Sequence, residues 1–211
     1  MTDGIVLQLQ AEALDENIEI ETLLRKAYLV ARKLHLKEFE NWISSEQNGY
    51  KGNVPEYRII GVEIKAWNPF HGWIPVVFEG ELADTFSRMP LSLPISAISD
   101  AYNSSDGTIA FTVPGGLTDL LNKNMASIPT NYAFRSSKPE LRKIISAVRN
   151  KILEWSILLE ENGIYGTGLS FSDSEIKKAQ ESQVINNYIN NFYSSSENTQ
   201  IQQGGDSNQQ S

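Results

Sequence analysis

The stretch SKPELRKIISAVRNKILEWSILLEENG, residues 137–163, decides the fold of this chain. Apolar residues recur along it at every third or fourth position, namely Leu141, Ile144, Ile145, Val148, Ile152, Trp155 and Leu159. That period places them on one face of a helix, and Gly163 is well suited to end it. The sequence therefore predicts a helix from about Pro139 to Asn162, which provides one wall of a hydrophobic core.

Capping signals flank this region. Ser137 and Glu140 have the spacing at which each side chain satisfies a free backbone amide in the first turn of a helix. Ser172 and Glu175 repeat the same spacing. We expect a further helix to begin near Asp173 and to run toward the C-terminus.

The N-terminal part carries the same periodicity. A stripe of apolar residues predicts a helix over residues 19–34. The spacing of apolar residues from Leu36 to Ile43 predicts a second, shorter helix. Asn48-Gly49 is a suitable end for it, because both residues tolerate positive φ.

The middle of the chain contains shorter elements. Residues 60–66 alternate between apolar and polar and predict a half-buried strand, and residues 73–78 predict its partner in a hairpin. Further elements are expected as helix 93–102, strand 108–113, helix 116–124 and strand 132–134. The sequence thus predicts an α+β fold, helix-rich at both ends, with a small antiparallel β region in the middle and a low-complexity C-terminal tail.

Charge divides the chain into two parts. All 18 Lys and Arg residues lie at or before Lys178, and the last part is rich in Asn, Gln and Ser. Such a composition is typical of low-complexity segments. We therefore expect a globular domain over residues 1–180 and an Asn/Gln/Ser-rich tail over residues 181–211.

Composition also argues against several kinds of site and partner. The chain has no cysteine, which excludes disulfides, Cys-zinc sites and thiol nucleophiles. Its carboxylates are scattered among basic residues, so no metal and no cofactor are expected. The net charge of −8, with basic clusters separated by acids, predicts no nucleic-acid partner. No apolar window has the length of a transmembrane segment and no signal peptide is recognisable, so a cytoplasmic protein is expected.

An aromatic turn in the hairpin is a candidate ligand pocket, with Trp67, His71 and Trp73 as its residues and Arg58 as a possible fourth. His71 is one of two histidines and is the candidate general base of a nuclease or hydrolase. In the alternative, the aromatic residues pack the hairpin onto the core and His71 is exposed at its tip. Arg58 is a further candidate for binding an acidic partner, although pairing with a helix carboxylate is favoured. Catalytic residues are not identified, so enzymatic activity stays an open question.

The tail carries a candidate assembly motif, made of Asn198, Gln200, Ile201, Gln202, Gly204 and Asn208. In a cross-β stack, Asn and Gln side chains form hydrogen-bonded ladders, Ile fills the dry contacts between sheets, and Gly permits a sharp turn. In the alternative, the tail is disordered or helical and has no assembly function.

Motifs at both ends of the chain resemble those of a known family. They are EFENWI at 38–43, NGY at 48–50, PEYR at 55–58, VRNK at 148–151 and GLSFS at 168–172. Through them, residues 5–180 resemble the AbiTii abortive-infection family of bacterial phage-defence loci, with Gln47 as a departure where leucine is expected. The tail is similar to bacterial amyloid signalling motifs related to the RIP homotypic interaction motif, because residues 200–204 match its Gln-hydrophobic-Gln-x-Gly core.

These resemblances imply a function in antiviral defence and phage resistance. We expect an abortive-infection effector or adaptor whose tail recruits it by homotypic self-assembly or by pairing with a partner that carries a similar motif. One alternative is an intracellular nuclease or hydrolase with a site near the aromatic hairpin. Another is a constitutive oligomeric module for protein–protein interaction.

Overall fold

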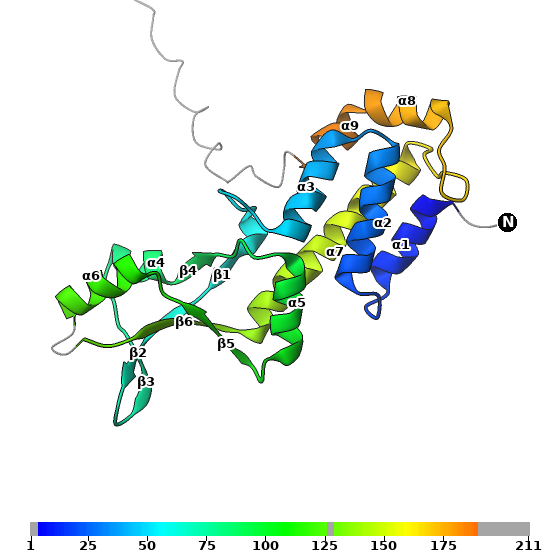
Figure 1. Cartoon of the computed structure of the whole chain (residues 1–211). Helices are drawn as coiled ribbons and strands as arrows, with labels where there is room; N and C mark the ends of the chain where they lie inside the picture. Colours follow the sequence, from blue (N-terminus) through cyan, green and yellow to red (C-terminus); the bar gives the residue numbers. More distant parts are fainter. Residues whose placement is uncertain (1–3, 126–128, 190–211) are drawn as a thin grey trace, which may run out of the picture.

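The computed structural model describes residues 4–125 and 129–189. A helical part and a part built on small antiparallel sheets lie at opposite ends of the molecule, and α7 (Lys138–Glu161) runs from one into the other (Figure 1). The predicted α+β class, with helices at both ends and strands in the middle, is confirmed. Within the described residues, no helix has the length and apolar character needed to cross a membrane.

The helical part is built around α7. Its buried face is the one predicted, and it packs against α1 (Ile5–Leu14), α2 (Ile20–Lys33) and α5 (Ile95–Ser104). α3 (Lys37–Asn48) reaches the same core through Phe39, whose ring stacks on the indole of Trp155 at 3.7 Å between centroids. Burying side chains of this size contributes about 1.5–3 kcal/mol each.

Two of the N-terminal helices agree with the sequence prediction, and one was not predicted. α2 occupies the expected range, and α3 ends where Gly49 adopts φ 86°. The prediction has no element at α1, whose first residues are apolar without a clear period. Ile5, Val6 and Leu9 are nevertheless buried, because α1 lies along α7 and α2 in the folded chain.

The main sheet has four antiparallel strands in the order β3-β2-β6-β5. Their bounds are β2 (Glu63–Asn68), β3 (Gly72–Pro75), β5 (Thr108–Thr112) and β6 (Tyr132–Ser137). β2 and β3 form the predicted hairpin. β6 passes directly into α7, so the sheet and the main helix are joined without a loop (Figure 1).

The predicted single strand over residues 60–66 is wrong in one respect. It is divided at Val62 between β1 (Ile59–Gly61), which pairs with β4 (Arg88–Pro90), and β2, which pairs with β6. The backbone N–H of Val62 donates to the carbonyl of Ser87 at the crossing point. The apolar alternation continues through this point, and alternation alone does not show which strand is the partner.

The remaining helices cover the sheet and the C-terminal end. They are α4 (Glu81–Phe86), which was not predicted, α6 (Gly115–Met125), α8 (Asp173–Glu181) and α9 (Gln183–Asn187). In α9, Ile185 is 3% exposed, and Ile189 after it is 4% exposed. The packed structure therefore continues past residue 180, where the composition changes.

One predicted capping box forms and the other does not. Ser172 accepts from the amide of Glu175, and Glu175 accepts from the amide of Ser172, as predicted. At the start of α7, Ser137 makes no side-chain cap, and the carboxylate of Glu140 accepts instead from the amide of Gly61 at 3.0 Å. Ser137 has the extended backbone usual at an N-cap, with φ −100° and ψ 153°, and it also pairs with Thr108 as the last residue of β6.

Candidate functional site

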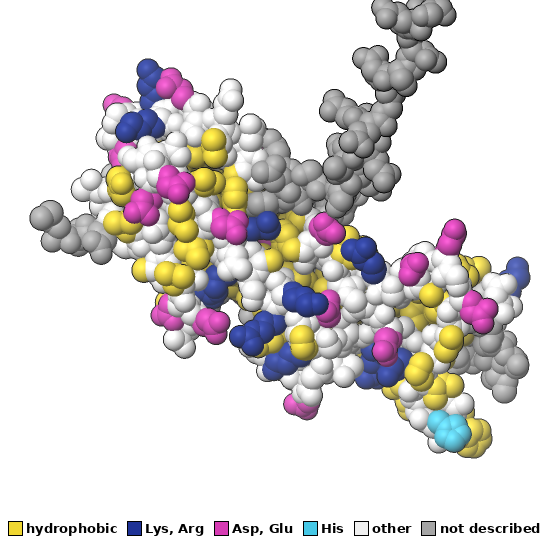
Figure 2. Space-filling view, turned by 180° about the vertical axis from the view of Figure 1, so that it is seen from behind, with side chains coloured by type: hydrophobic (Ala, Val, Ile, Leu, Met, Phe, Trp, Pro, Cys, Tyr) yellow, Lys and Arg dark blue, Asp and Glu magenta, His cyan; other side chains and the backbone are white. Residues whose placement is uncertain are grey.

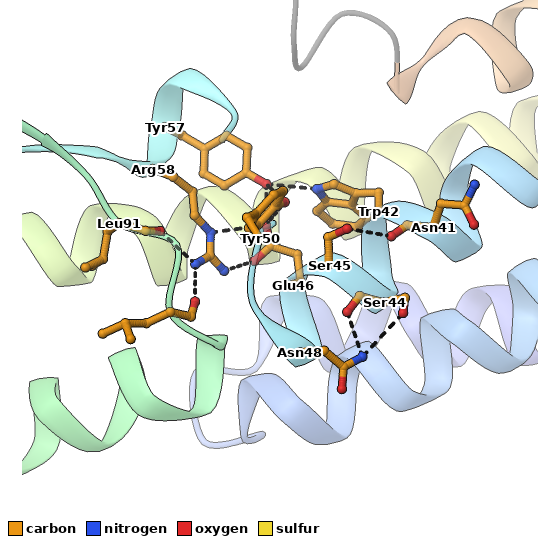
Figure 3. Close-up of polar contacts among 11 residues, drawn as sticks. Asn41, Trp42, Ser44, Ser45, Glu46, Asn48, Tyr50, Tyr57, Arg58 and Leu91 are labelled. Carbon is orange, nitrogen blue, oxygen red and sulfur yellow. Dashed lines mark hydrogen bonds and ion pairs between the residues drawn. The ribbon is translucent and has the colours of Figure 1, made fainter. Parts of the chain in front are cut away.

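Arg58 lies in a cluster that we call the buried junction, made of Glu46, Tyr50, Tyr57 and Arg58 (Figure 3). Glu46 comes from α3, Tyr50 from the loop after it, and Tyr57 and Arg58 from the short helix η1 (Glu56–Arg58). Arg58 and Glu46 are both 0% exposed and form an ion pair. The sequence interpretation in which Arg58 pairs with a helix carboxylate is therefore confirmed.

Each charged group of the junction is compensated by several bonds. The guanidinium of Arg58 donates to the carbonyl oxygens of Leu91 at 3.3 Å and Leu93 at 2.5 Å, and the ring of Tyr50 lies 4.9 Å from it (Figure 3). The hydroxyls of Tyr50 and Tyr57 donate to Glu46 Oε1 at 2.5 and 2.6 Å. A buried ion pair is stable only when its remaining donors and acceptors are satisfied in this way.

The two tyrosines of the junction are held in their neutral form. Burial, followed by the nearby charge of Glu46, raises the pKa of Tyr50 and of Tyr57 above the ordinary value. Trp42 Nε1 donates to the hydroxyl of Tyr57 at 2.8 Å, so the 38–43, 48–50 and 55–58 motifs meet in space. Because Glu46 and Arg58 are fully buried and the side chains of Tyr50 and Tyr57 are only partly exposed, these motifs support the fold here.

The aromatic hairpin brings Trp67 and Trp73 together. They lie opposite each other on β2 and β3, with their rings edge to face at 5.5 Å. The side-chain oxygen of Asn68 accepts from the amides of Phe70 and His71, which fixes the turn. Trp67 is 45% exposed and Phe70 90% exposed, so the hairpin presents aromatic surface to solvent.

The structure places the other two predicted pocket residues apart from this pair. His71 is exposed at the tip, and within the described residues its imidazole makes no hydrogen bond with a carboxylate or hydroxyl that would make it a general base. Arg58 directs all its donors into the buried junction. No group of three or more possible metal ligands occurs among the described residues.

A different arginine lies beside the aromatic pair. Arg135 on β6 is opposite Glu63, which places it on the same face of the sheet as Lys65, Trp67 and Trp73. Its guanidinium lies 5.3 Å from the ring of Trp73, and its Nε is buried without a hydrogen-bond partner. Sequence reasoning missed Arg135, although its place in a predicted strand next to the hairpin partner was the available signal.

The last described residues are tied to α7. The hydroxyl of Tyr188 donates to the carbonyl of Lys151 at 3.1 Å and to the carboxylate of Glu154 at 2.6 Å. Lys151 Nζ lies 5.1 Å from the ring of Tyr57. The end of α9 is therefore fixed close to the buried junction. The predicted assembly motif, from Asn198 to Asn208, lies outside the described residues.

Comparison with known proteins gives one family. The sequence model of AbiTii matches residues 4–184, which includes all the elements from α1 to α8 and ends within α9. No curated protein and no solved structure matches the chain.

Proposed function

The chain belongs to the AbiTii family, which implies a function in abortive infection and antiviral defence, and we propose that its tail recruits it for that function by homotypic assembly. In this proposal the matched body, residues 4–184, carries the effector or adaptor activity. The tail brings copies of the body together, or joins one to a partner with a similar motif.

The observation that carries the proposal is the change in amino-acid composition and charge directly after the matched region. The body contains all 18 Lys and Arg residues, and the segment that follows is nearly free of charge and contains the Gln200–Gly204 motif. Asn, Gln and Ile in a segment of low charge favour stacking of identical chains. Ile185 of α9 and Tyr188 after it hold the start of this segment against the body.

The mechanism is proximity. Tethering many bodies along one assembly raises their effective concentration to about the millimolar range, without any change in the contacts of a single body. An activity that needs two or more bodies then begins only when the tails assemble. This explanation needs no conformational change within the body.

A truncation that respects the packing of α9 tests the proposal. A chain that ends at Ile189 keeps Ile185 and Ile189 in the core, whereas an end at residue 180 would remove both. We expect the full-length chain, expressed in a bacterial host, to arrest growth or to protect the culture on phage infection, and the truncated chain to do neither. Equal behaviour of the two chains would overturn recruitment by the tail.

Two variants that each add one carboxylate distinguish an effect of the motif from an effect of the tail as a whole. Ile201→Asp places a carboxylate within the motif, where stacking would bring identical charges about 4.7–4.8 Å apart. Ser195→Asp adds the same charge outside it. We expect only Ile201→Asp to prevent the full-length chain from sedimenting as assemblies and to abolish protection. If both variants assemble normally, the motif is not the recruiting element.

A further inference from the structure

Basic residues that are distant in the sequence lie along one path in the structure. We call this surface the basic track: Lys65, Arg135, Lys138, Arg142, Lys143 and Arg149, with the aromatic residues Trp67, Trp73 and Tyr102. It follows β6 into the first half of α7, a distance of at most about 30 Å. Figure 2 shows Lys and Arg side chains gathered across the middle of one face of the molecule.

The track is hollowed along its length. Near the hairpin, a polar hollow of about 450 Å³ is lined by Lys65 and Arg135. Over the first turns of α7, Tyr102, Lys138 and Arg142 line a second hollow of about 480 Å³. A third, of about 200 Å³, shares Tyr102 and Arg142 with the second and extends to Arg149. The second and third hollows therefore adjoin each other over α7, and the first is a separate recess that Glu63 and Glu140 also line.

The carboxylates of the track neutralise it only partly. Glu63 lies 3.7 Å from Lys65, and Glu16 lies 3.9 Å from Arg142. Glu140 pairs with Lys143 on the surface. Solvent-exposed pairs of this kind contribute about 0–1 kcal/mol and leave the cation free to exchange its partner.

Two cations of the track, Arg135 and Lys138, lie against aromatic rings and have no acidic partner among the described residues. Arg149 has none either, but its guanidinium donates to the carbonyls of Glu12, Asp15 and Ile18. Among the described residues, no carboxylate lies within ion-pair distance of Arg135 or Lys138. Each lies instead against an aromatic ring, Arg135 at 5.3 Å from Trp73 and Lys138 Nζ at 4.7 Å from Tyr102. Arg135 also keeps a buried Nε–H without an acceptor. An anion on this surface would supply the charge partner that Arg135 and Lys138 lack, whereas the Nε–H of Arg135 is itself closed to solvent and Lys138 Nζ also donates to the carbonyl of Ser105 at 3.5 Å.

Cations beside exposed aromatic rings have a specific chemical meaning. Proteins that bind single strands use cations for the phosphates and aromatic side chains on which successive bases stack. Trp67, which is 45% exposed, offers such a ring at one end, whereas Tyr102 of α5 is half-buried and its ring already faces Lys138 Nζ. A duplex keeps its bases stacked on one another and would use only the cations.

We propose that the basic track binds single-stranded nucleic acid through phosphate contacts to its cations and stacking of a base on Trp67. The proposal goes beyond the proposed function and does not depend on the tail. It also reverses the expectation drawn from the sequence, where the basic clusters are separated by acids. Folding brings Arg135 and Lys65 to one sheet face, and β6 leads directly into α7, which carries Lys138 and Arg142.

Fluorescence anisotropy of the full-length chain tests the proposal. The probes are labelled single strands of about 12 nucleotides, within the usual site size of about 4–16, in one RNA arm and one DNA arm. We expect a Kd of about 10⁻⁴–10⁻⁶ M at physiological salt and tighter binding at lower salt. With three or four phosphate contacts, the logarithm of the affinity should fall with the logarithm of salt at a slope of about −2 to −3.

Variants separate charge from stacking. Lys138→Ala and Arg142→Ala should each weaken binding and make the salt slope less negative by about 0.7. Trp67→Ala should weaken binding about tenfold and leave the slope unchanged. Arg25→Ala is the matched control, because Arg25 is an exposed α2 arginine outside the track. Circular dichroism of each variant establishes that it is folded.

Four results would overturn the proposal. The first is no binding of either strand at low salt, and the second is an equal loss of affinity in Arg25→Ala. The third is that a duplex of the same length binds as tightly as the single strand and that Trp67→Ala does not weaken binding. Attraction between charges would then be the only contribution to binding. The fourth is tighter binding to anionic lipid vesicles that the same variants abolish, which would make a membrane the partner. A preference for RNA or for DNA supports the proposal and identifies the source of the strand.

Discussion

Arg58 and Arg135 have the same chemistry in opposite settings. Arg58 is fully buried, and its donors reach Glu46 and the carbonyls of Leu91 and Leu93. Arg135 is partly exposed, lies against Trp73 and keeps a buried Nε–H without an acceptor. Both contact an aromatic ring, so the ring does not distinguish them. The difference lies in whether the protein itself supplies the anion.

This difference separates stability from binding. A guanidinium with a buried carboxylate partner holds segments of the chain together, and here it joins α3 to η1 and to the chain before α5. A guanidinium without a buried carboxylate partner adds little to the stability of the fold and remains available to a ligand. The comparison therefore predicts large losses of stability at the buried junction and losses of binding alone at the basic track.

The largest effect is expected for Arg58→Met. It leaves the carboxylate of Glu46 buried without its cation, which costs about 3–5 kcal/mol of the free energy of unfolding. That is a large fraction of a typical total of about 5–15 kcal/mol. Urea unfolding followed by circular dichroism measures it.

Two further variants make this test specific. Arg25→Met breaks the exposed pair with Glu21 and should cost less than about 1 kcal/mol. Adding Glu46→Leu to Arg58→Met removes the uncompensated charge and should recover part of the loss. A loss below about 1 kcal/mol for Arg58→Met would mean that the junction does not hold these segments together.

Tyr57→Phe should cost about 1–2 kcal/mol at neutral pH, because Glu46 loses a hydrogen-bond donor. The loss depends on pH in a defined direction. Since burial and Glu46 raise the pKa of Tyr57, its phenol stays neutral in the folded chain while it ionises in the unfolded chain above about pH 10. The stabilisation is therefore fully present below pH 10 and is lost above it.

Urea unfolding of both chains at pH 8 and pH 11 checks this pH dependence. The contribution of Tyr57 to the free energy of unfolding should fall by up to about 1.4 kcal/mol for each pH unit above 10. The difference in this free energy between the unsubstituted chain and Tyr57→Phe should therefore be smaller at pH 11 than at pH 8. Tyr165→Phe, at a residue that is 44% exposed, should alter the free energy by less than about 0.5 kcal/mol. A constant difference across this range would show that Tyr57 is not in a buried, neutral state.

Glu175 is expected to affect stability by an amount between the effects of Arg58 and Arg135, because it is partly exposed and accepts hydrogen bonds from backbone amides. Burial alone would raise the pKa of Glu175, but the amides of Ser172, Gly166 and Tyr165 and the hydroxyl of Ser172 lower it to about 2. Its stabilisation is therefore present above pH 4.5 and is lost as pH falls toward 2. Solvent screening limits it to about 1 kcal/mol.

Glu175→Gln is the corresponding variant. We expect it to lower the free energy of unfolding by about 1 kcal/mol at pH 7, with the difference narrowing as the pH falls below 4.5. Glu181→Gln, at a carboxylate that is 68% exposed, is the control. A difference that stays constant down to pH 3 would assign the effect to the lost hydrogen-bond geometry and not to the charge.

The sequence predicted those features that depend on local chemistry. The apolar period of α7, the hairpin and the Ser172–Glu175 capping box each follow from residues close together in the chain. Predictions failed where a distant segment intervened. In the predicted capping box of α7, Glu140 bonds instead to the distant amide of Gly61, and residues 60–66 divide because β4 and β6 pair with different halves.

The two arginines show the same limit at the level of the site. The sequence favoured a helix carboxylate as the partner of Arg58 without identifying Glu46, and that kind of pairing is confirmed. Arg135 contacts an aromatic ring from another strand, and no spacing rule connects it to Trp73. Its importance follows only from the order of strands in the sheet, which the sequence leaves open.

The smallest effect on stability, and the most informative, is expected for Arg135→Gln. The variant removes a cation with no acidic partner, so the free energy of unfolding should change by less than about 0.5 kcal/mol. Affinity for a single strand should still fall several-fold, because one phosphate contact and one cation above Trp73 are lost. Unfolding and anisotropy on the same sample measure both. If Arg135→Gln instead unfolds as easily as Arg58→Met, both arginines hold the fold together, and the distinction between a satisfied and an available guanidinium fails.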